Sequence, residues 1–537
     1  MKKIAKFLIV LGMMGQLSSC DYLDIVPDER AQESDTWKTE GAVRGYLYSC
    51  YGYLPANRTF GNSYWLAEEL TAVTKELFTT FKYGYYSPVS LGFTSNTWST
   101  IWNGIHQCYM FQESLKQVSN EYVTDEMKKQ YLAESNFLIA YYHFLSMRSY
   151  GPTMIIRSVI DLETPISGLP ERSSIDEVVA FINEKLDEAM SEGGLPTTWS
   201  GKDYGRATRL AALALKSRVY LYAASPLYNG NTEMYADFRS PLDGRQLIAQ
   251  EKSQAKWEIS ATQTKYAIDE VEKAKFHLYH DADAGEPSDA KPGLPNKAQR
   301  RLRYTNIDNQ TGNNPEIIWA DTRNDDYYGI QRRCPPRQTL GGKFAGISMT
   351  NCPTLQTIEA FYTKNGLPIN KDKTFDYDER YEYISAPENC DGNNYEDLVK
   401  YANFTPSSDK VMRLCTDREP RFYAWTTYHN GYFEFGKYNN EEISADPAKR
   451  AIRIHLLRDD PHGRGNRTDQ EYSISGFGNK KGVVPSAEWN VIEYPFPLFR
   501  LAELYLNYAE ALVELDRLSE AKVYLDKVRE RAGIPSV

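Results

Sequence analysis

Histidine is scarce in the sequence, and three common catalytic or phosphate-binding motifs are missing from it. It has 7 histidines in 537 residues, and it has no H-E-x-x-H, G-x-S-x-G or G-x-x-x-x-G-K-[ST] motif. The formal net charge is -10, and it becomes -13 once the three lysines of the leader described below are removed. Because phosphate binding needs a surplus of Lys and Arg, we expect no nucleic acid partner.

Cysteine is scarce, and none of it is spaced as C-x-x-C. A disulfide framework is not needed in a chain of this size, and a metal cluster is not indicated. Cys334 and Cys352 lie in the same loop-rich stretch, where a disulfide and a pair of buried free thiols are equally compatible with the sequence. Six cysteines follow Cys20 in the sequence: Cys50, Cys108, Cys334, Cys352, Cys390 and Cys415.

The apolar run at the beginning of the sequence is too short to span a bilayer. Two lysines and the run from Phe7 to Gly15 are typical of a secretory leader, which we assign to residues 1–19. It ends in Leu-Ser-Ser-Cys, which resembles the lipobox of bacterial lipoproteins, although an ordinary leader with a chance cysteine is the alternative. We therefore expect Cys20 to be acylated and to tether the protein to a membrane without crossing it.

Most of the sequence before residue 280 predicts amphipathic helices. Ser174 and Glu177 form a capping box, and the segment 208–224 is apolar on most sides, so it is expected to be central. Between residues 281 and 493, Gly, Pro, Asn and Asp predominate. There we expect one helix, Thr354–Thr363, and short strands such as Glu316–Ala320 and Arg421–Phe435. Helical spacing covers residues 37–51, 98–109, 127–150, 175–189, 208–224, 257–279 and 501–528.

The C-terminal segment, residues 496–535, predicts a hairpin of two helices. Ala521 fits the small-residue position of a tetratricopeptide repeat, Ser519 is expected to cap the second helix, and Gly533 is expected to end it. Such a hairpin cannot bury its apolar face alone, so the chain must contain neighbouring hairpins. We expect a mainly α fold with a large loop-rich half that contains a few short strands.

Nine phrases of the sequence, taken in order, resemble the SusD/RagB family of outer-membrane lipoproteins. They cover nearly the whole chain: CDYLDIVPDE, AESNFLIAYYHFLSMRSYGP, SSIDEVVAFINEKLDEAM, RATRLAALALKSRVYLYAASPLYNG, KWEISATQTKYAIDEVEKAKFHLY, NNPEIIWA, PTLQTIEAFYTKNGLPI, REPRFYAW and FPLFRLAELYLNYAEALVEL. The resemblance implies about four tetratricopeptide-like hairpins and an irregular ligand-binding half. It implies a tether plus helical region over residues 20–300 and a C-terminal region over 301–537, which ends earlier than the family pattern.

The resemblance also implies a function. Such a protein is lipid-anchored on the outer face of the outer membrane, captures oligosaccharide, and passes it to a SusC-like TonB-dependent transporter. Some members of the family take peptides instead, which is our first alternative. An exported glycoside hydrolase is the second, because the 72 carboxylates could include a catalytic pair, although no motif supports one. We expect no enzyme activity.

Two loop clusters have the composition that sugar binding requires, with aromatic faces beside polar side chains. Turn formation with incidental tyrosines is the alternative for both clusters. Trp98, Trp102 and Trp319 are interpreted instead as buried packing residues, because of their apolar neighbours. The candidate ligand residues are Tyr83, Tyr85, Tyr86 and Asn96 in the first cluster, and Arg323, Asn324, Asp326, Tyr327, Tyr328 and Arg332 in the second.

The sequence predicts no cofactor and no metal site. Two acidic stretches, 324–326 and 391–394, offer oxygen ligands of the kind that structural calcium takes, but neither has EF-hand spacing and turn formation explains both. His277 and His280 are expected on one helix face without a third ligand, so we interpret them as surface residues. His143 is expected to be a packing residue.

Overall fold

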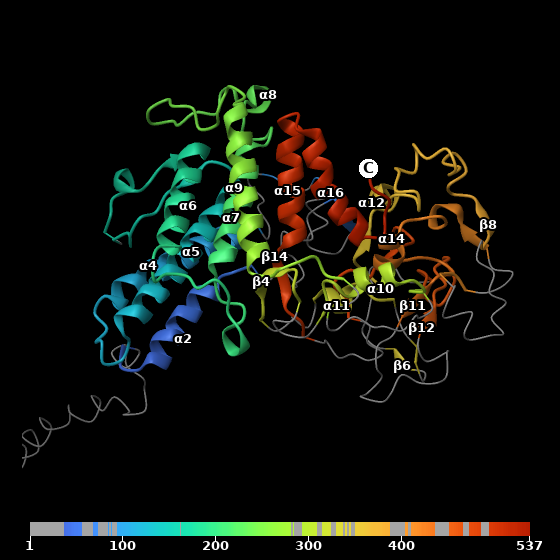
Figure 1. Cartoon of the computed structure of the whole chain (residues 1–537), viewed down its shortest axis with the longest axis horizontal. Coiled ribbons are helices and arrows are strands. Elements are labelled where there is room, and N and C mark those ends of the chain that lie inside the picture. The colour runs from blue at the N-terminus through green and yellow to red at the C-terminus, as the bar shows by residue number, and fades with distance from the viewer. Residues whose placement is uncertain are drawn as a thin grey trace, which may run out of the picture.

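The structure is a computed structural model with a helical half and a loop-rich half, which meet at a pair of strands (Figure 1). Tetratricopeptide-like hairpins form the helical half, as expected. Cys20, Cys390 and the stretches 324–326 and 391–394 lie outside the described residues. The structure describes residues 37–55, 68–73, 84, 87, 94–161, 163–280, 283, 293–308, 314–323, 329–336, 339–340, 343–344, 349–386, 403–405, 410–434, 451–465, 472–484 and 493–537.

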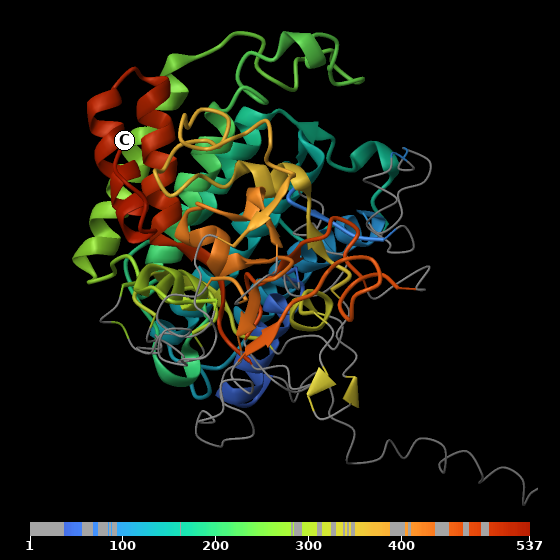
Figure 2. The same cartoon turned by 90° about the vertical axis from the view of Figure 1, so that its right-hand side faces the viewer.

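Four pairs of helices pack against one another in the helical half. α15 also packs against α9, so the C-terminal hairpin closes a stack that the preceding helices begin (Figures 1 and 2). This arrangement buries the apolar face that no single hairpin can bury. The pairs are α2 (Glu40–Tyr51) with α4 (Thr94–Leu115), α5 (Asp125–Tyr150) with α6 (Ile175–Ala189), α7 (Arg209–Ala224) with α9 (Gln254–Lys273), and α15 (Leu501–Glu514) with α16 (Leu518–Arg531).

The central helix of the stack is α7, as its apolar sequence predicts. Ala211, Ala212 and Ala214 are fully buried, and their small side chains let α7 approach its neighbours closely. Arg218 joins α7 to the closing hairpin because it donates two hydrogen bonds of 2.6 Å to the carboxylate of Glu503 on α15. The C-terminal hairpin is therefore attached to the centre of the stack by a partly buried ion pair.

Capping residues account for most helix starts, and several helix boundaries differ from expectation. The Ser174 capping box is present at α6. α16 begins at Leu518 with Arg517 in the N-cap position, so Ser519 lies inside the helix and the expected cap was wrong. α9 ends at Lys273, six residues before the expected end at residue 279, because the chain turns at Lys275 with φ 71°. His277 therefore does not lie on a helix.

The loop-rich half contains short helices and small two-stranded antiparallel sheets. Arg421–Phe435 was expected to be strand-like, which is wrong for its first part, because a proline at the first helical position begins α14 (Pro420–Trp425). The other short helices of this half are α10 (Lys297–Tyr304), α11 (Ile330–Arg333) and α12 (Leu355–Ala360), with the 3₁₀ turn η5 (Arg413–Cys415). The helical half contains the short helix α8 (Thr232–Tyr235) and the 3₁₀ turns η3 (Ile166–Gly168) and η4 (Gly201–Asp203).

The strands pair within and across the two halves of the chain. Among the described residues they are β1 (Leu70–Thr71) with β7 (Cys352–Pro353), β2 (Thr153–Met154) with β3 (Arg172–Ser173), β4 (Ile317–Asp321) with β14 (Phe496–Arg500), β5 (Thr339–Leu340) with β6 (Lys343–Phe344), β8 (Tyr383–Ser385) with β9 (Lys410–Met412), β10 (Thr426–Thr427) with β13 (Gly478–Asn479), and β11 (Tyr432–Glu434) with β12 (Ala451–Arg453). Strand β4 was expected; β14 was not.

Buried charges hold the loop-rich half together where regular structure is sparse. Arg303 and Lys480 both bind the fully buried carboxylate of Glu434, and Arg303 also donates to the carbonyl of Lys480 at 2.7 Å. Arg418 is 2% exposed and donates to the carbonyls of Leu414, at 2.6 Å, and Ile358, at 2.7 Å. Burial lowers the pKa of Arg418 to about 10. Such side chains satisfy backbone carbonyls that no sheet pairs.

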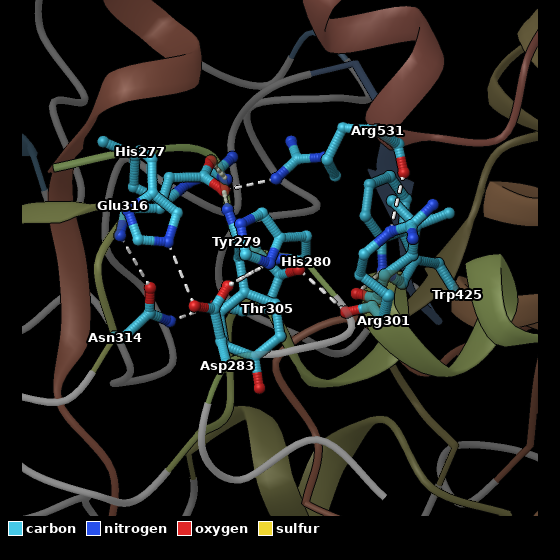
Figure 3. Close-up of polar contacts among 12 residues, drawn as sticks. His277, Tyr279, His280, Asp283, Arg301, Thr305, Asn314, Glu316, Trp425 and Arg531 are labelled. Atoms are coloured by element: carbon cyan, nitrogen blue, oxygen red, sulfur yellow. Dashed lines mark hydrogen bonds and ion pairs between the residues drawn. The ribbon is translucent and has the colours of Figure 1, made fainter. Parts of the chain in front are cut away.

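Glu316 connects the two halves at the start of β4 (Figure 3). Its fully buried carboxylate accepts a hydrogen bond from Arg500 at 2.6 Å and forms an ion pair with Arg531 at the end of α16. It also accepts from the backbone N–H of Tyr279 at 2.9 Å. One carboxylate therefore joins β14, the closing hairpin and the connector that follows α9.

Two further questions concern whether Cys334 and Cys352 form a disulfide and whether a helix could span a membrane. Within the described part of the chain, Cys334 and Cys352 are buried free thiols, as are Cys50, Cys108 and Cys415. The free-thiol alternative therefore holds in this structure, and the disulfide is not formed. Across the same residues, none of the helices has the length and apolar character that crossing a membrane requires.

We expect the substitution Glu316→Gln to destabilise the protein by roughly 3 to 5 kcal/mol, because it leaves the charges of Arg500 and Arg531 buried without their anion. Urea unfolding followed by tryptophan fluorescence measures the change. Glu184→Gln is the matched control. Glu184 pairs with Arg157 at the surface, where the side chains are 43% and 58% exposed, so its loss should cost less than about 1 kcal/mol. Equal effects of the two substitutions would contradict the role of Glu316.

The same carboxylate should make stability depend on acid pH. Burial alone would raise the pKa of Glu316, but the charges of Arg531 and Arg500 outweigh burial and lower it below its usual value. Glu316 therefore stabilises the fold above the pKa of the unfolded chain, and this contribution is lost as pH falls through the lowered folded-state value. The Glu316→Gln protein should lose less stability over that acid range.

Candidate functional site

Two adjoining cavities lie where β4 ends beside α2, and each has a volume of about 290 Å³. The segment Tyr204–Arg206, after η4, lines both of them. We name them by their aromatic walls. The tryptophan cavity is lined by residues that include Trp199, Ser200, Phe276, Asn314 and Trp319, and the tyrosine cavity by residues that include Tyr48, Tyr51, Lys202, Asp321, Thr322 and Arg323.

Gly205 lines both cavities and lies against β4. Its φ is +99°, and a Cβ atom built on it would lie 2.8 Å from Oγ1 of Thr322. Its carbonyl accepts a hydrogen bond of 2.9 Å from Nε1 of Trp319. Only glycine allows both this backbone conformation and this close approach to β4. The shape of both cavities therefore depends on a residue without a side chain.

Arg206 forms the polar floor and is fixed by a fully buried carboxylate. Its Nε donates to Oε2 of Glu134 at 3.2 Å, and its guanidinium lies 4.2 Å from the ring centre of Trp199. Tyr51 donates to the same Glu134 at 2.6 Å and accepts from the N–H of Ala207 at 2.9 Å. Burial raises the pKa of Glu134, and the hydrogen bonds from Arg206 and Tyr51 offset only part of that rise.

Besides Tyr51, two tyrosines line the tyrosine cavity. Tyr48 lies on the outer face of α2 and is 40% exposed, whereas Tyr204 is half-buried after η4. Burial raises the pKa of Tyr204 to about 12 and also raises that of Tyr48, so both hydroxyls stay protonated at neutral pH. A protonated phenol can donate a hydrogen bond, and its ring offers an apolar face.

Arg323 is a predicted ligand residue that borders the tyrosine cavity. Its guanidinium makes four hydrogen bonds: to the carbonyls of Leu54 at 2.8 Å and Pro55 at 2.9 Å, and to the two carboxylate oxygens of Asp321 at 2.9 and 2.6 Å. It therefore ties the end of α2 to the end of β4.

The structure places few of the other predicted ligand residues. Arg332 lies in α11 and is not among the described residues that line the two cavities. Asn96 lies in α4, but its side chain is outside the described part of the chain. Also outside the described residues are Tyr83, Tyr85, Tyr86, Asn324, Asp326, Tyr327 and Tyr328.

Of the residues interpreted as buried packing residues, Trp319 and His143 are buried as expected, whereas Trp98 and Trp102 are only half-buried. Trp319 is 3% exposed in β4, and Trp102 packs against the helical core. Trp98 contacts Trp102 edge to face at 5.3 Å between ring centres. His143 is fully buried and donates from Nδ1 to the carbonyl of Ile139 at 2.8 Å, while burial lowers its pKa to about 4. None of these four residues lines the tyrosine cavity.

Sequence reasoning missed Tyr48, Lys202, Tyr204 and Thr322. Tyr48 could have been found, because it follows the apolar stripe of the predicted helix 37–51 on its polar side, where a large aromatic residue is unusual. The others could not, because they meet Tyr48 only when η4 and the end of β4 come together. Their adjacency is a product of tertiary packing rather than of local sequence.

The comparisons with known proteins agree with this architecture. A model described as the SusD family matches residues 315–537, and a model described as starch-binding and associating with the outer membrane matches residues 21–221. The protein called BT4246 has a solved structure that is 28% identical, with a TM-score of 0.76 over 93% of this chain and 83% of that one. No curated protein matches.

A second solved structure supports the fold alone. The SusD-like protein BF3747 from Bacteroides fragilis is 20% identical, with a TM-score of 0.64 over 94% of this chain and 81% of that chain. The fold is therefore that of the SusD-like proteins, in which tetratricopeptide-like hairpins carry an irregular half. The chain belongs to the SusD/RagB family.

We expect Gly205→Ala to deform the cavity wall and to destabilise the protein by about 1 to 3 kcal/mol, because the residue must change its backbone conformation or displace Thr322. Thermal unfolding and Trp fluorescence measure the effect, since Trp319 donates to the carbonyl of Gly205. Gly201→Ala is the control: its φ is +58° and a Cβ there would meet nothing within 4 Å. It should cost less and leave the fluorescence unchanged.

Proposed function

We propose that this chain is a non-catalytic oligosaccharide receptor that is lipid-anchored through Cys20 on the outer face of the outer membrane. In this proposal it passes its ligand to a SusC-like TonB-dependent transporter. The observation that carries the proposal is the composition of the tyrosine cavity. It combines a half-exposed aromatic face with polar groups, in a chain whose N-terminal family model is described as starch-binding and associating with the outer membrane.

The chemistry of the tyrosine cavity suits a neutral sugar. A sugar ring presents apolar C–H faces and hydroxyl edges, so it binds where an aromatic plane lies beside hydrogen-bonding groups. Tyr48 supplies the plane, and Lys202, Thr322 and Tyr204 supply polar groups around it. The volume of about 290 Å³ lies at the lower end of small-molecule sites, so the cavity fits part of an oligosaccharide rather than all of it.

The same cavity does not favour a glycoside hydrolase. Hydrolysis needs two carboxyl groups on opposite sides of the scissile bond, one of them able to give up a proton. Among the described residues that line the two cavities, Asp321 is the only carboxylate, and Arg323 binds both of its oxygens. A carboxylate that is neutralised in this way is a poor general acid or nucleophile.

The soluble protein without residues 1–20 should bind an oligosaccharide and release no product. Isothermal titration calorimetry against a panel of glucans, other glycans and peptides measures binding, and chromatography of the same mixtures measures cleavage. Binding of peptides alone would favour the peptide-receptor alternative, and shortened glycan would favour the hydrolase. Binding of neither class would contradict the proposal.

Replacing Tyr48 by Ala should weaken glycan binding by roughly tenfold, which corresponds to about 1.4 kcal/mol, because one aromatic contact face is lost. The melting temperature should change little, since the side chain is 40% exposed. Tyr266→Ala is the matched control: Tyr266 is 44% exposed on α9 and does not line the cavity. A large loss of thermal stability in Tyr48→Ala would instead make Tyr48 a packing residue.

A further inference from the structure

The connector that follows α9 brings two imidazoles and a carboxylate together (Figure 3). His277, His280 and Asp283 each offer one ligand atom, and these atoms all lie within 4.8 Å of one another. The histidines were expected on a helix face without a third ligand. That expectation is wrong, because α9 ends at Lys273 and the chain then turns so that Asp283 faces both rings.

The distances within the cluster are those of ligands that share a cation. Oδ1 of Asp283 is 3.1 Å from Nε2 of His277, and Oδ2 is 3.3 Å from Nδ1 of His280. The two imidazole rings stack with 4.7 Å between their centres. In a tetrahedral zinc site with metal–ligand bonds of about 2.0 to 2.1 Å, adjacent ligand atoms are about 3.3 Å apart. The two carboxylate oxygens of Asp283 therefore already lie at about this distance from Nε2 of His277 and Nδ1 of His280.

The tautomer of His277 strengthens this interpretation. Its Nδ1 lies 3.3 Å from the carbonyl oxygen of Lys275, an acceptor to which it donates a hydrogen bond. When Nδ1 carries the proton, Nε2 of the neutral ring presents a lone pair to the carboxylate of Asp283. At 3.1 Å this pair is satisfied either by a proton on Nε2, which makes an ion pair with Asp283, or by a metal ion that both atoms bind. A backbone carbonyl that fixes the second ring nitrogen in this way is a regular feature of metal-binding histidines.

The backbone holds the three ligands in place without a metal. The N–H of His277 donates to the carbonyl of Pro315 at 3.1 Å, and the N–H of Tyr279 donates to Glu316 at 2.9 Å. The N–H of His280 donates to Oδ2 of Asp283 at 2.6 Å, while the N–H of Asp283 donates back to the carbonyl of His280 at 3.0 Å. Such preorganisation reduces the cost of ordering the ligands when a metal binds.

We infer that His277, His280 and Asp283 form a binding site for a divalent metal of the zinc class. The donor set favours Zn²⁺ over Ca²⁺ or Mg²⁺, because imidazole nitrogen suits zinc and the other two ions prefer oxygen. The histidine side chains are 46% and 52% exposed, so solvent reaches the site and one coordination position stays open to water. The carboxylate is 9% exposed and supplies the negative charge.

The position of the site gives the bound metal a structural role. Tyr279 lies between the two histidines and donates to Glu316, the carboxylate that joins the two halves. A metal at His277 and His280 would brace this connector from its solvent side. We therefore expect metal binding to stabilise the fold without taking part in ligand capture at the tyrosine cavity.

A second group of histidines is the rival site, and its geometry is less suited to a metal. His429, His455 and His462 approach one another with ring centres 6.1 and 6.4 Å apart. Nδ1 of His462 accepts from the N–H of His455 at 3.0 Å, and Nδ1 of His429 accepts from the N–H of Leu456 at 3.0 Å. These two nitrogens already use their lone pairs for backbone hydrogen bonds.

Titration of the full-length protein with ZnCl₂ and CaCl₂, followed by calorimetry and thermal unfolding, tests the inference. We expect one Zn²⁺ per chain with a Kd on the order of micromolar, weaker than that of four-ligand structural sites, together with a rise in melting temperature. CaCl₂ should give neither effect. Co²⁺ should bind at the same stoichiometry and give the visible absorption bands of a low-coordinate nitrogen and oxygen site.

The variants His277→Ala, His280→Ala and Asp283→Asn should each weaken Zn²⁺ binding by about tenfold or more and abolish the rise in melting temperature. His106→Ala removes an exposed histidine on α4 and should change nothing, and His455→Ala tests the rival cluster. Full affinity in His277→Ala, or its loss in His455→Ala alone, would overturn the assignment. Glycan binding measured in parallel should be the same in all five variants, so this result is independent of the proposed function.

Discussion

The structure depends on one buried carboxylate that three segments of the chain share. Glu316 binds Arg500 at the end of β14, Arg531 at the end of α16, and the N–H of Tyr279 in the connector. These segments come from the middle and the C-terminal end of the sequence, and apolar packing alone would not fix their relative position. An ion pair in a buried site is directional and costly to break, so it fixes the position of the closing hairpin relative to β4.

The position of β4 in turn determines the candidate site. Its C-terminal end carries Asp321, Thr322 and Arg323 into the tyrosine cavity, and Arg323 binds back to the carbonyls that follow α2. The cavity is therefore assembled from α2, η4 and β4, which the helical stack and the strand pair hold in place. Its described walls are rigid elements with satisfied hydrogen bonds, which is the condition for a site that binds without rearranging.

Local sequence predicted the structure correctly where the pattern of apolar residues along a single helix determines how that helix packs. The Ser174 capping box, the buried alanines of α7 and the C-terminal hairpin follow from spacing alone. Local sequence did not predict contacts between residues that are far apart in the chain. Residues 496–500 form strand β14 because β4 lies beside them. Asp283 lies close to His277 because α9 ends early. The same reason explains why Lys202, Tyr204 and Thr322 were missed, since they meet only where η4 and the end of β4 come together.

The buried polar residues beneath the cavities and the exposed residues at the edge of the tyrosine cavity differ in how easily they can be replaced. Arg206, Glu134 and Tyr51 bind one another below the cavities, so replacing one of them would leave a buried group unsatisfied and cost stability before it altered specificity. Tyr48 and Lys202 have no such constraint, because their side chains reach solvent at the edge of the tyrosine cavity. A change of ligand preference is therefore least costly at the edge of the cavity, where a side chain can be exchanged without disturbing the hydrogen bonds among Arg206, Glu134 and Tyr51.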